Sequence, residues 1–133
     1  MEIVIDTSAV LAVISEQAEK AALIRLTRGA TLVAPASLHW EVGNALSAMF
    51  KRKIIGIKEA LKLLELYVAI PIRLADIGLK QAVELSASLN IYAYDAYVIA
   101  CAMNQRAPLL TLDSGLTARA RELKLGVLEV NVS

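Results

Sequence analysis

Four acidic residues of this 133-residue chain have the types and positions needed for metal-assisted chemistry. Carboxylates that lie within a few ångströms of one another raise each other's pKa, and a bound cation reverses this effect. Hard oxygen ligands without a neighbouring cysteine favour Mg²⁺ or Mn²⁺ over zinc. We therefore treat the following residues as candidate metal ligands and catalytic residues: Asp6, Glu41, Asp95 and Asp113.

A cation held by these acids is expected to position a phosphodiester, activate a water molecule and stabilise the departing oxygen. That chemistry needs no nucleophilic side chain, and the sequence offers no convincing one. His39 is the only histidine, and Gly-x-Ser-x-Gly is absent, so Ser-His-Asp hydrolysis is poorly supported. Glycine-rich dinucleotide and P-loop motifs are also absent. His39 does not belong to a His-Glu-x-x-His motif, and we predict that it is a packing or helix-surface residue.

Short β-rich runs alternate with longer helical patterns along the chain. This alternation predicts an α/β fold in which a parallel sheet is covered by helices on both faces. We expect one domain over residues 1–133, with about five strands in a three-layer α/β/α sandwich. The predicted strands lie at about 2–6, 31–34, 70–74, 108–112 and 127–130, and the predicted helices at about 8–14, 16–28, 37–53, 57–68, 77–89, 94–105 and 115–123.

The predicted sheet would bring the four acids to one edge, because ligands of open α/β sheets bind outside the carboxyl ends of the strands. Asp6 ends the first strand and Asp113 ends the fourth. Glu41 lies in the first turns of the helix after the second strand, and Asp95 opens the helix before the fourth. A simpler alternative stays open, since aspartate is a favoured helix N-cap and a solvated glutamate is unremarkable.

Composition narrows the class of protein. The chain is 57% hydrophobic and 20% charged, which is typical of a globular domain. The net charge is only +1, so nucleic acid would have to be bound by a local patch or through cations. Cys101 is the only cysteine, which excludes an internal disulfide, and its apolar surroundings predict a buried, inert thiol. We see no signal-peptide or membrane-spanning pattern and expect a cytoplasmic protein without a membrane partner.

The chain resembles the PIN-domain ribonucleases and, within them, the VapC-like toxins of toxin–antitoxin pairs. The resemblance covers the whole chain and rests on four segments in the family's order. These segments are Asp6-Thr7-Ser8-Ala9, Glu41-Val42-Gly43-Asn44-Ala45-Leu46, Tyr94-Asp95-Ala96-Tyr97-Val98-Ile99-Ala100 and Leu109-Leu110-Thr111-Leu112-Asp113.

This resemblance implies an endoribonuclease that depends on Mg²⁺ or Mn²⁺. The four acidic positions of the family fall on Asp6, Glu41, Asp95 and Asp113, and they imply that these residues bind the metal. The resemblance also implies an RNA substrate, an inhibitory antitoxin protein and a homodimer.

Three further residues are candidates for orienting the acids. Thr7 is next to Asp6, Asn44 is one turn beyond Glu41, and Thr111 lies two residues before Asp113. Each could hydrogen-bond a ligating carboxylate and fix its rotamer. Local capping by Thr7 and a same-face strand contact by Thr111 are the alternatives.

The predicted helix at about 57–68 is apolar over roughly half of its circumference, which is more than one core contact needs. We hypothesise that part of it meets a second protomer or an antitoxin helix. Lys51 and Arg52 lie about 15 Å along a helix from Glu41, at about 1.5 Å per residue, and could hold RNA phosphate. Three tyrosines near Asp95 could stack a base, although core packing is favoured for them: Tyr92, Tyr94 and Tyr97.

Two other classes of function stay open. A phosphatase could use Asp6 as its nucleophile, but such enzymes usually carry a second aspartate two residues on, where this chain has Ser8. The other class is a non-catalytic binding module whose acids only cap helices; it predicts no metal affinity.

Overall fold

The fold is a four-stranded parallel sheet with seven helices, as seen in a computed structural model that describes residues 1–132. The strand order is β3-β2-β1-β4, and every pair of neighbours is parallel. The strands are β1 (Glu2–Ile5), β2 (Thr31–Pro35), β3 (Ile72–Ala75) and β4 (Leu109–Leu110). The helices are α1 (Thr7–Ile14), α2 (Lys20–Thr27), α3 (Leu38–Lys51), α4 (Ile57–Ala69), α5 (Leu79–Leu89), α6 (Ala93–Gln105) and α7 (Ser114–Glu122).

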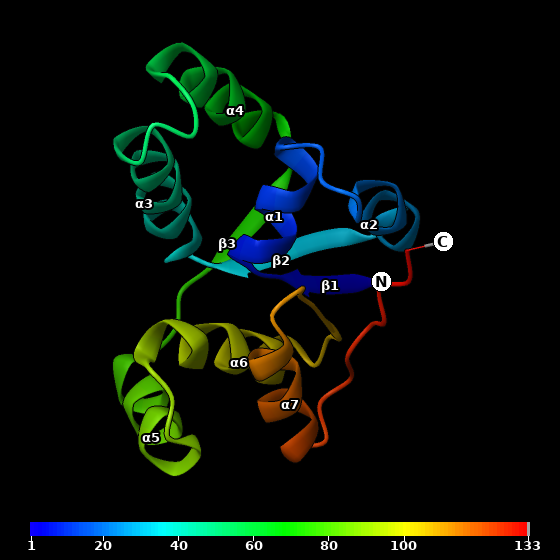
Figure 1. Cartoon of the computed structure of the whole chain (residues 1–133). Helices are drawn as coiled ribbons and strands as arrows, with labels where there is room; N and C mark the ends of the chain where they lie inside the picture. Colours follow the sequence, from blue (N-terminus) through cyan, green and yellow to red (C-terminus); the bar gives the residue numbers. More distant parts are fainter. Residues whose placement is uncertain (133) are drawn as a thin grey trace.

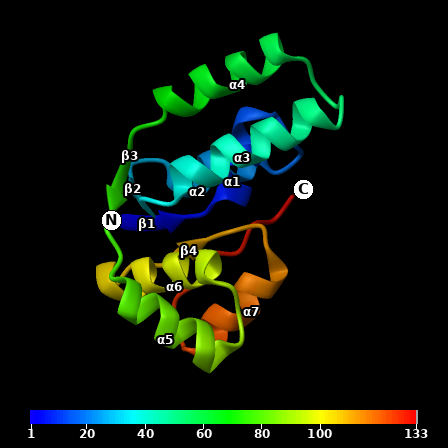
Figure 2. The ribbon, with the colours of Figure 1, turned by 90° about the vertical axis from the view of Figure 1, so that its left-hand side faces the viewer.

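The helices cover both faces of the sheet, so the predicted three-layer α/β/α architecture is confirmed. Helices α1 to α4 lie on one side of the sheet, and α5 to α7 lie on the other (Figure 1). The turned view shows the same layers, with α3 and α4 above the strands and α5 and α6 below them (Figure 2). Parallel strands need such crossover connections, because a tight turn cannot join them.

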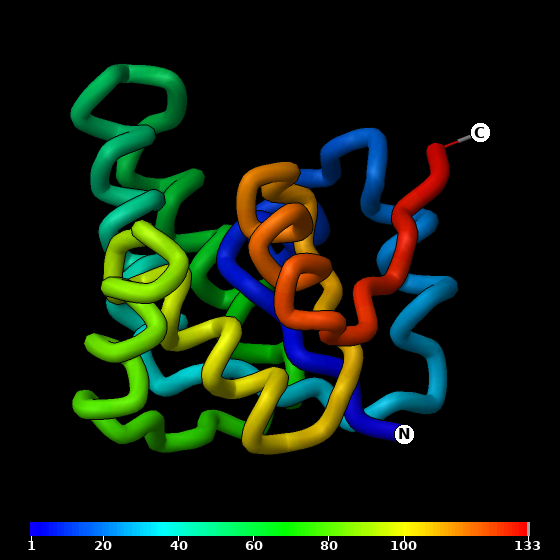
Figure 3. The backbone as a smooth tube through the Cα atoms, turned by 90° about the horizontal axis from the view of Figure 1, so that it is seen from below, coloured from blue at the N-terminus to red at the C-terminus, as the bar shows by residue number. Residues whose placement is uncertain are grey.

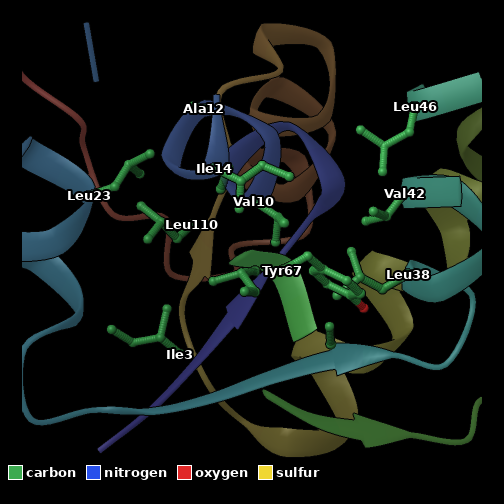
Figure 4. Close-up of a cluster of buried hydrophobic side chains, with 13 residues drawn as sticks. Ile3, Val10, Ala12, Ile14, Leu23, Leu38, Val42, Leu46, Tyr67 and Leu110 are labelled. Atoms are coloured by element: carbon green, nitrogen blue, oxygen red, sulfur yellow. The ribbon is translucent and has the colours of Figure 1, made fainter. Parts of the chain in front are cut away.

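The sheet separates two apolar cores. Ile3 and Ile5 of β1 enter the core under α1 to α4, together with Leu110 (Figure 4). Val4, between them in the sequence, enters the core under α5 to α7 with Leu109. Successive strand residues point to opposite faces, so a sheet covered on both sides needs continuous apolar strands. This requirement explains the Ile-Val-Ile and Leu-Leu runs that directly precede the aspartate-bearing segments.

Helix α6 is the inner helix of its layer. Seen from below the sheet, its yellow trace runs between α5 and α7 (Figure 3), and α6 contacts both β1 and β2. Ala96, Ala100 and Ala102 are fully buried, and their small side chains allow α6 to lie close to β1 and β2. Cys101 is also fully buried, and burial raises the pKa of its thiol to about 11. The thiol is therefore protonated and inert, as predicted.

The fifth predicted strand does not form. Residues 127–130 contribute a single parallel bridge, between Val127 and Leu109, so the sheet has four strands instead of about five. Strand β4 also ends at Leu110, two residues earlier than expected. The reason is local: the Ser8 hydroxyl accepts the N–H of Leu112, and the Thr111 hydroxyl accepts the N–H of Asp113. These two N–H groups are therefore not available for backbone hydrogen bonds that would extend strand β4.

His39 is exposed on α3 and packs against Tyr67, which confirms the prediction of a helix-surface or packing residue. Its ring lies edge-on to Tyr67, and its Nδ1 is 2.7 Å from the Tyr67 hydroxyl, which joins α3 to α4. Within residues 1–132, no helix is both long enough and apolar enough to span a membrane.

Candidate active site

Asp6 is the most enclosed of the four acids, with only 7% of its surface exposed. It follows β1 and caps the N-terminus of α1, where its Oδ1 accepts the Ala9 N–H at 3.1 Å. The Ser8 hydroxyl donates to the same oxygen at 2.7 Å, and the Thr111 hydroxyl donates to Oδ2 at 2.5 Å. Three donors therefore fix the orientation of this carboxylate.

Asp113 is placed by the same hydroxyl that orients Asp6. It caps the N-terminus of α7, and its Oδ1 accepts the Leu116 N–H at 3.0 Å. Its own N–H donates to Thr111 Oγ1 at 3.0 Å. Thr111 thus connects the backbone of one acid to the carboxylate of the other, across the ends of the adjacent strands β4 and β1.

Glu41 and Asp95 come from the first turns of α3 and α6. The Ser37 hydroxyl donates to Glu41 Oε2 at 3.2 Å. Asp95 is half-buried, and its carboxylate makes no hydrogen bond to any residue in 1–132. The residue at the N-cap of α6 is Tyr92, so capping does not account for Asp95. The capping alternative is correct for Asp6 and Asp113 and wrong for Asp95.

The four acids lie close enough to influence one another's protonation. Burial raises the pKa of Asp6, and the charge of Asp113 raises it further, against the hydrogen bonds from Thr111 and Ser8. Burial also raises the pKa of Glu41, with added effects of the charges of Asp6 and Asp95. The pKa of Asp95 is raised by burial and then by the charges of Asp113 and Asp6. The structure therefore brings all four predicted residues into one electrostatic cluster.

Within residues 1–132, no basic side chain forms an ion pair with this cluster. The ion pairs within residues 1–132 all join other residues, and none includes Asp6, Glu41, Asp95 or Asp113. Desolvated carboxylates without a positive partner are costly unless they take up protons or a metal ion. Their oxygens are the ligands that Mg²⁺ and Mn²⁺ prefer, so the donor set fits such an ion.

The four acids suit a divalent ion by the chemistry of their oxygens and by their charge, but they do not form a closed cage around one. Among residues 1–132, no three Asp, Glu, His or Cys side chains converge tightly enough to enclose an ion. Mg²⁺ usually keeps several of its waters and binds few carboxylates directly, so a closed protein cage is not required for it.

The three candidate orienting residues differ in their placement. Thr111 hydrogen-bonds Asp6 directly, as described above. The Thr7 hydroxyl is buried and makes no hydrogen bond of ordinary geometry within the described residues, yet it lies near enough to Glu41 to lower the pKa of that carboxyl against the larger effect of burial. Asn44 is exposed on α3, and no hydrogen bond between described residues joins it to Glu41. The role of Asn44 stays a prediction.

Sequence reasoning missed two hydroxyls that the structure places in the site. Ser8 bonds Asp6 and the backbone of Leu112, and Ser37 bonds Glu41. A signal for Ser37 was present, because a serine four residues before a glutamate on the same helix faces it. Ser8 belongs to the segment Asp6-Thr7-Ser8-Ala9, but its position two residues after Asp6 does not by itself indicate a contact with that carboxylate.

The comparison that decides the family is a match over nearly the whole chain. The model of the PIN domain family matches residues 3–122, which include all four acids. The chain belongs to the PIN-domain family. Members of this family are nucleases. No curated protein sequence matches the chain.

Solved structures share the fold at low sequence identity. PAE2754 from Pyrobaculum aerophilum is 18% identical, with a TM-score of 0.74 over 96% of this chain and 83% of that one. VapBC2 from Rickettsia felis, bound to a promoter DNA fragment, is 16% identical, with a TM-score of 0.72 over 98% of this chain and 100% of that one. VapC20 from Mycobacterium tuberculosis is 15% identical, with a TM-score of 0.63 over 87% and 93% of the two chains.

Proposed function

We propose that this PIN-domain protein is an endoribonuclease that depends on Mg²⁺ or Mn²⁺. The observation that carries the proposal is the cluster of four carboxylates at the carboxyl edge of the sheet. Three of them have raised pKa values, and no basic side chain within residues 1–132 forms an ion pair with any of the four. A divalent cation would offset the repulsion and would be held by Asp6, Glu41, Asp95 and Asp113.

When bound, a divalent ion would supply Lewis acidity toward a phosphodiester and a water molecule. The protein's own residues supply orientation. Ser8 and Thr111 hold the Asp6 carboxylate in one rotamer, and Ser37 holds that of Glu41. Asp95 has no such restraint within the described residues, so its carboxylate is free to adjust to a ligand. Orientation by hydrogen-bonded neighbours is a common requirement of metal sites.

We further propose that the chain is the toxin of a toxin–antitoxin pair. Its structural neighbours support this assignment. VapC20 is described as a toxin that cleaves the sarcin–ricin loop, and VapBC2 and FitAcB from Neisseria gonorrhoeae are also among the neighbours. The partners in this proposal are RNA, an antitoxin protein and a second copy of the chain, and the site of action is the cytoplasm.

The phosphatase alternative fits the structure poorly. Such enzymes usually carry a second aspartate two residues after the nucleophile, whereas here Ser8 holds that position and donates its hydroxyl to Asp6. The binding-module alternative leaves Asp95 without a role, because this residue caps no helix and makes no hydrogen bond within residues 1–132.

Asp95→Asn is the sharpest test of the proposed activity. The substitution is nearly isosteric and breaks no hydrogen bond between described residues, so the fold should be preserved. We expect the parent to cut RNA only with Mg²⁺ or Mn²⁺, and the variant to be slower by more than about 100-fold. Glu59→Gln, an exposed acid on α4, is the matched control and should cut like the parent. Cleavage by the Asp95→Asn variant at the rate of the parent, or cleavage by the parent in EDTA, would contradict the proposal.

A further inference from the structure

An open cleft of about 460 Å³ lies beside the acidic cluster. It is bounded by the end of β2, the start of α3, the loop between β3 and α5, and the starts of α5 and α6. In Figure 2, α3 lies above the sheet and α5 and α6 lie below it, so the cleft reaches from one helical layer to the other. Its lining includes Ser37, Trp40, Asp76, Leu79, Tyr94 and Tyr97.

The cleft is continuous with the candidate active site at two points. Ser37 lines the cleft and donates its hydroxyl to Glu41. Tyr94 lines the cleft and directly precedes Asp95. A polymer whose phosphate lies at the four acids would therefore have a neighbouring nucleotide within reach of this cleft.

The aromatic side chains of the cleft are unusually accessible. Trp40 is 73% exposed and Tyr94 is 56% exposed, although both are large and partly apolar. Tyr94 lies edge-on to Tyr97, with ring centroids 6.0 Å apart, so one aromatic ring supports the other. Exposed aromatic faces beside a phosphate-binding site are the usual means of stacking unpaired bases.

Asp76 adds a hydrogen-bonding group to this apolar lining. It is exposed, and no ion pair or side-chain hydrogen bond joins it to another residue in 1–132. An ionised carboxylate only accepts hydrogen bonds. The Watson–Crick edge of guanine offers two adjacent donors, its N1–H and N2–H, whereas adenine and cytosine each offer one amino group and uracil only an imide N–H.

We propose that this cleft binds one base of the RNA next to the cut phosphate, that Trp40 and Tyr94 stack on it, and that Asp76 favours guanine. This inference rests on the proposed ribonuclease function, and it adds a site that makes cleavage depend on the base sequence of the RNA. The sequence favoured core packing for Tyr94, and that expectation is wrong because more than half of this side chain is exposed.

Trp40 is the only tryptophan of the chain, so its fluorescence reports directly on the cleft. The titration uses Asp113→Asn with Mn²⁺, so that RNA is bound and not cut. Asparagine can still accept the Leu116 N–H, so the cap on α7 is kept. The probes are tetraribonucleotides that differ only in having guanine, adenine, cytosine or uracil at one position, with free N-acetyltryptophanamide as the optical control.

We expect the guanine-containing probe to quench Trp40 fluorescence and to bind about tenfold more tightly than the others. Asp76→Asn should remove this preference, whereas Glu59→Gln should retain it. In RNA cleavage by otherwise unaltered protein, Trp40→Ala should raise KM about tenfold with little change in kcat.

The outcomes separate the two proposals. If the parent cleaves RNA but no probe alters Trp40 fluorescence, the base site is wrong and the ribonuclease function stands. A fluorescence change that follows protein concentration and ignores RNA would make the cleft a contact between copies of the chain, which also overturns the proposal. Binding that is equal for all four bases and unchanged in Asp76→Asn would overturn the role of Asp76.

Discussion

Asp95 shows most simply what the acidic cluster costs the folded protein. Its carboxylate is half-buried, accepts no hydrogen bond from residues 1–132, and lies near the charges of Asp113 and Asp6. Nothing within this part of the chain compensates its ionisation. A half-buried carboxylate that caps no helix and has no compensating partner is typical of a functional site.

The raised pKa of Asp95 has a defined consequence for stability without metal. An acid with a raised pKa in the folded state stabilises the fold only while protonated, below its ordinary pKa. That stabilisation is lost as the pH rises through the folded-state value. Asp95→Asn should therefore raise the thermal midpoint in EDTA at pH 7, and the gain should shrink toward pH 4.

Thermal unfolding from pH 4 to pH 8 in EDTA would check this prediction. Glu59→Gln on α4 serves as the control, because that acid is exposed and lies outside the acidic cluster. A lower midpoint for Asp95→Asn than for the parent at pH 7 would show that the carboxylate has a stabilising partner, and would contradict the description of the cluster.

Single residues were predictable where they follow a strand or open a helix. The positions of Asp6 and Asp113 after their strands were sufficient to place them at one edge. Ser8 and Thr111 were harder, because Thr111 reaches Asp6 across 105 residues of sequence, and only the pairing of β1 with β4 brings them together. No local pattern encodes which hydroxyl will face a carboxylate across such a distance.

At the scale of elements, a small hydrogen-bond network joins the start of α1 to the start of α7. Thr111 donates to Asp6 and accepts from the backbone of Asp113, while Ser8 donates to Asp6 and accepts from the backbone of Leu112. The network fixes the two helix N-termini at the edge of the sheet, and it ends strand β4 after Leu110. The same hydrogen-bond network therefore determines both the position of the two aspartates and the length of strand β4.

Thr111→Val should loosen this connection. The substitution keeps the shape of a buried side chain but leaves an Asp6 oxygen and the Asp113 N–H without their partner. We expect a loss of about 1–3 kcal/mol in the free energy of unfolding, measured by urea titration. Thr111→Ser retains the hydroxyl and should lose less than half as much. A loss in Thr111→Val no larger than the loss in Thr111→Ser would contradict a stabilising role of the two hydrogen bonds.

The helices and most strands could be predicted because their periodicity is local. The continuous apolar runs of β1 and β4 and the helical stripes of α3 and α6 are properties of short segments. The segment 127–130 has a similar apolar composition, yet it forms only one bridge, since its neighbour β4 is two residues long. Whether an apolar segment becomes a strand depends on the partner beside it.

On the scale of the whole molecule, the surface of α4 differs from the acidic cluster because it is apolar. Large apolar side chains of α4 are exposed, including Ile57, Leu61, Leu66 and Val68. Helix α4 lies outermost in its layer, next to α3 and away from the sheet (Figure 1). The wide apolar arc expected from the sequence is thus present on the surface, and such a surface is typical of a contact with another chain.

We expect a second copy of the chain to cover part of the α4 surface. Sedimentation velocity should show a dimer at tens of micromolar, and the double variant Leu61→Lys, Val68→Lys should be monomeric with an unchanged far-UV circular dichroism spectrum. Lys58→Glu, Lys62→Glu, on the polar side of the same helix, is a control for altered charge. A parent that stays monomeric at these concentrations would remove the homodimer and leave the antitoxin as the expected occupant.

The layered fold could be predicted from the alternation of strands and helices in the sequence, but the cleft beside the acids could not. Trp40, Asp76 and Tyr94 belong to three segments that meet only when α3, the loop before α5 and α6 are assembled around the sheet. Their exposure is a property of that assembly. Sequence patterns identify what each segment buries more readily than what the assembled molecule leaves open.

The most direct test of the metal site is the thermal midpoint of the parent and of Asp95→Asn with and without Mn²⁺. An ion that binds only the folded state stabilises it by about 1.4 kcal/mol at ten times its Kd. For a domain of this size, that is a rise of about 5 °C. We predict this rise for the parent and a much smaller one for Asp95→Asn. No rise in the parent at millimolar Mn²⁺, or an equal rise in both proteins, would contradict a metal site formed by the four acids.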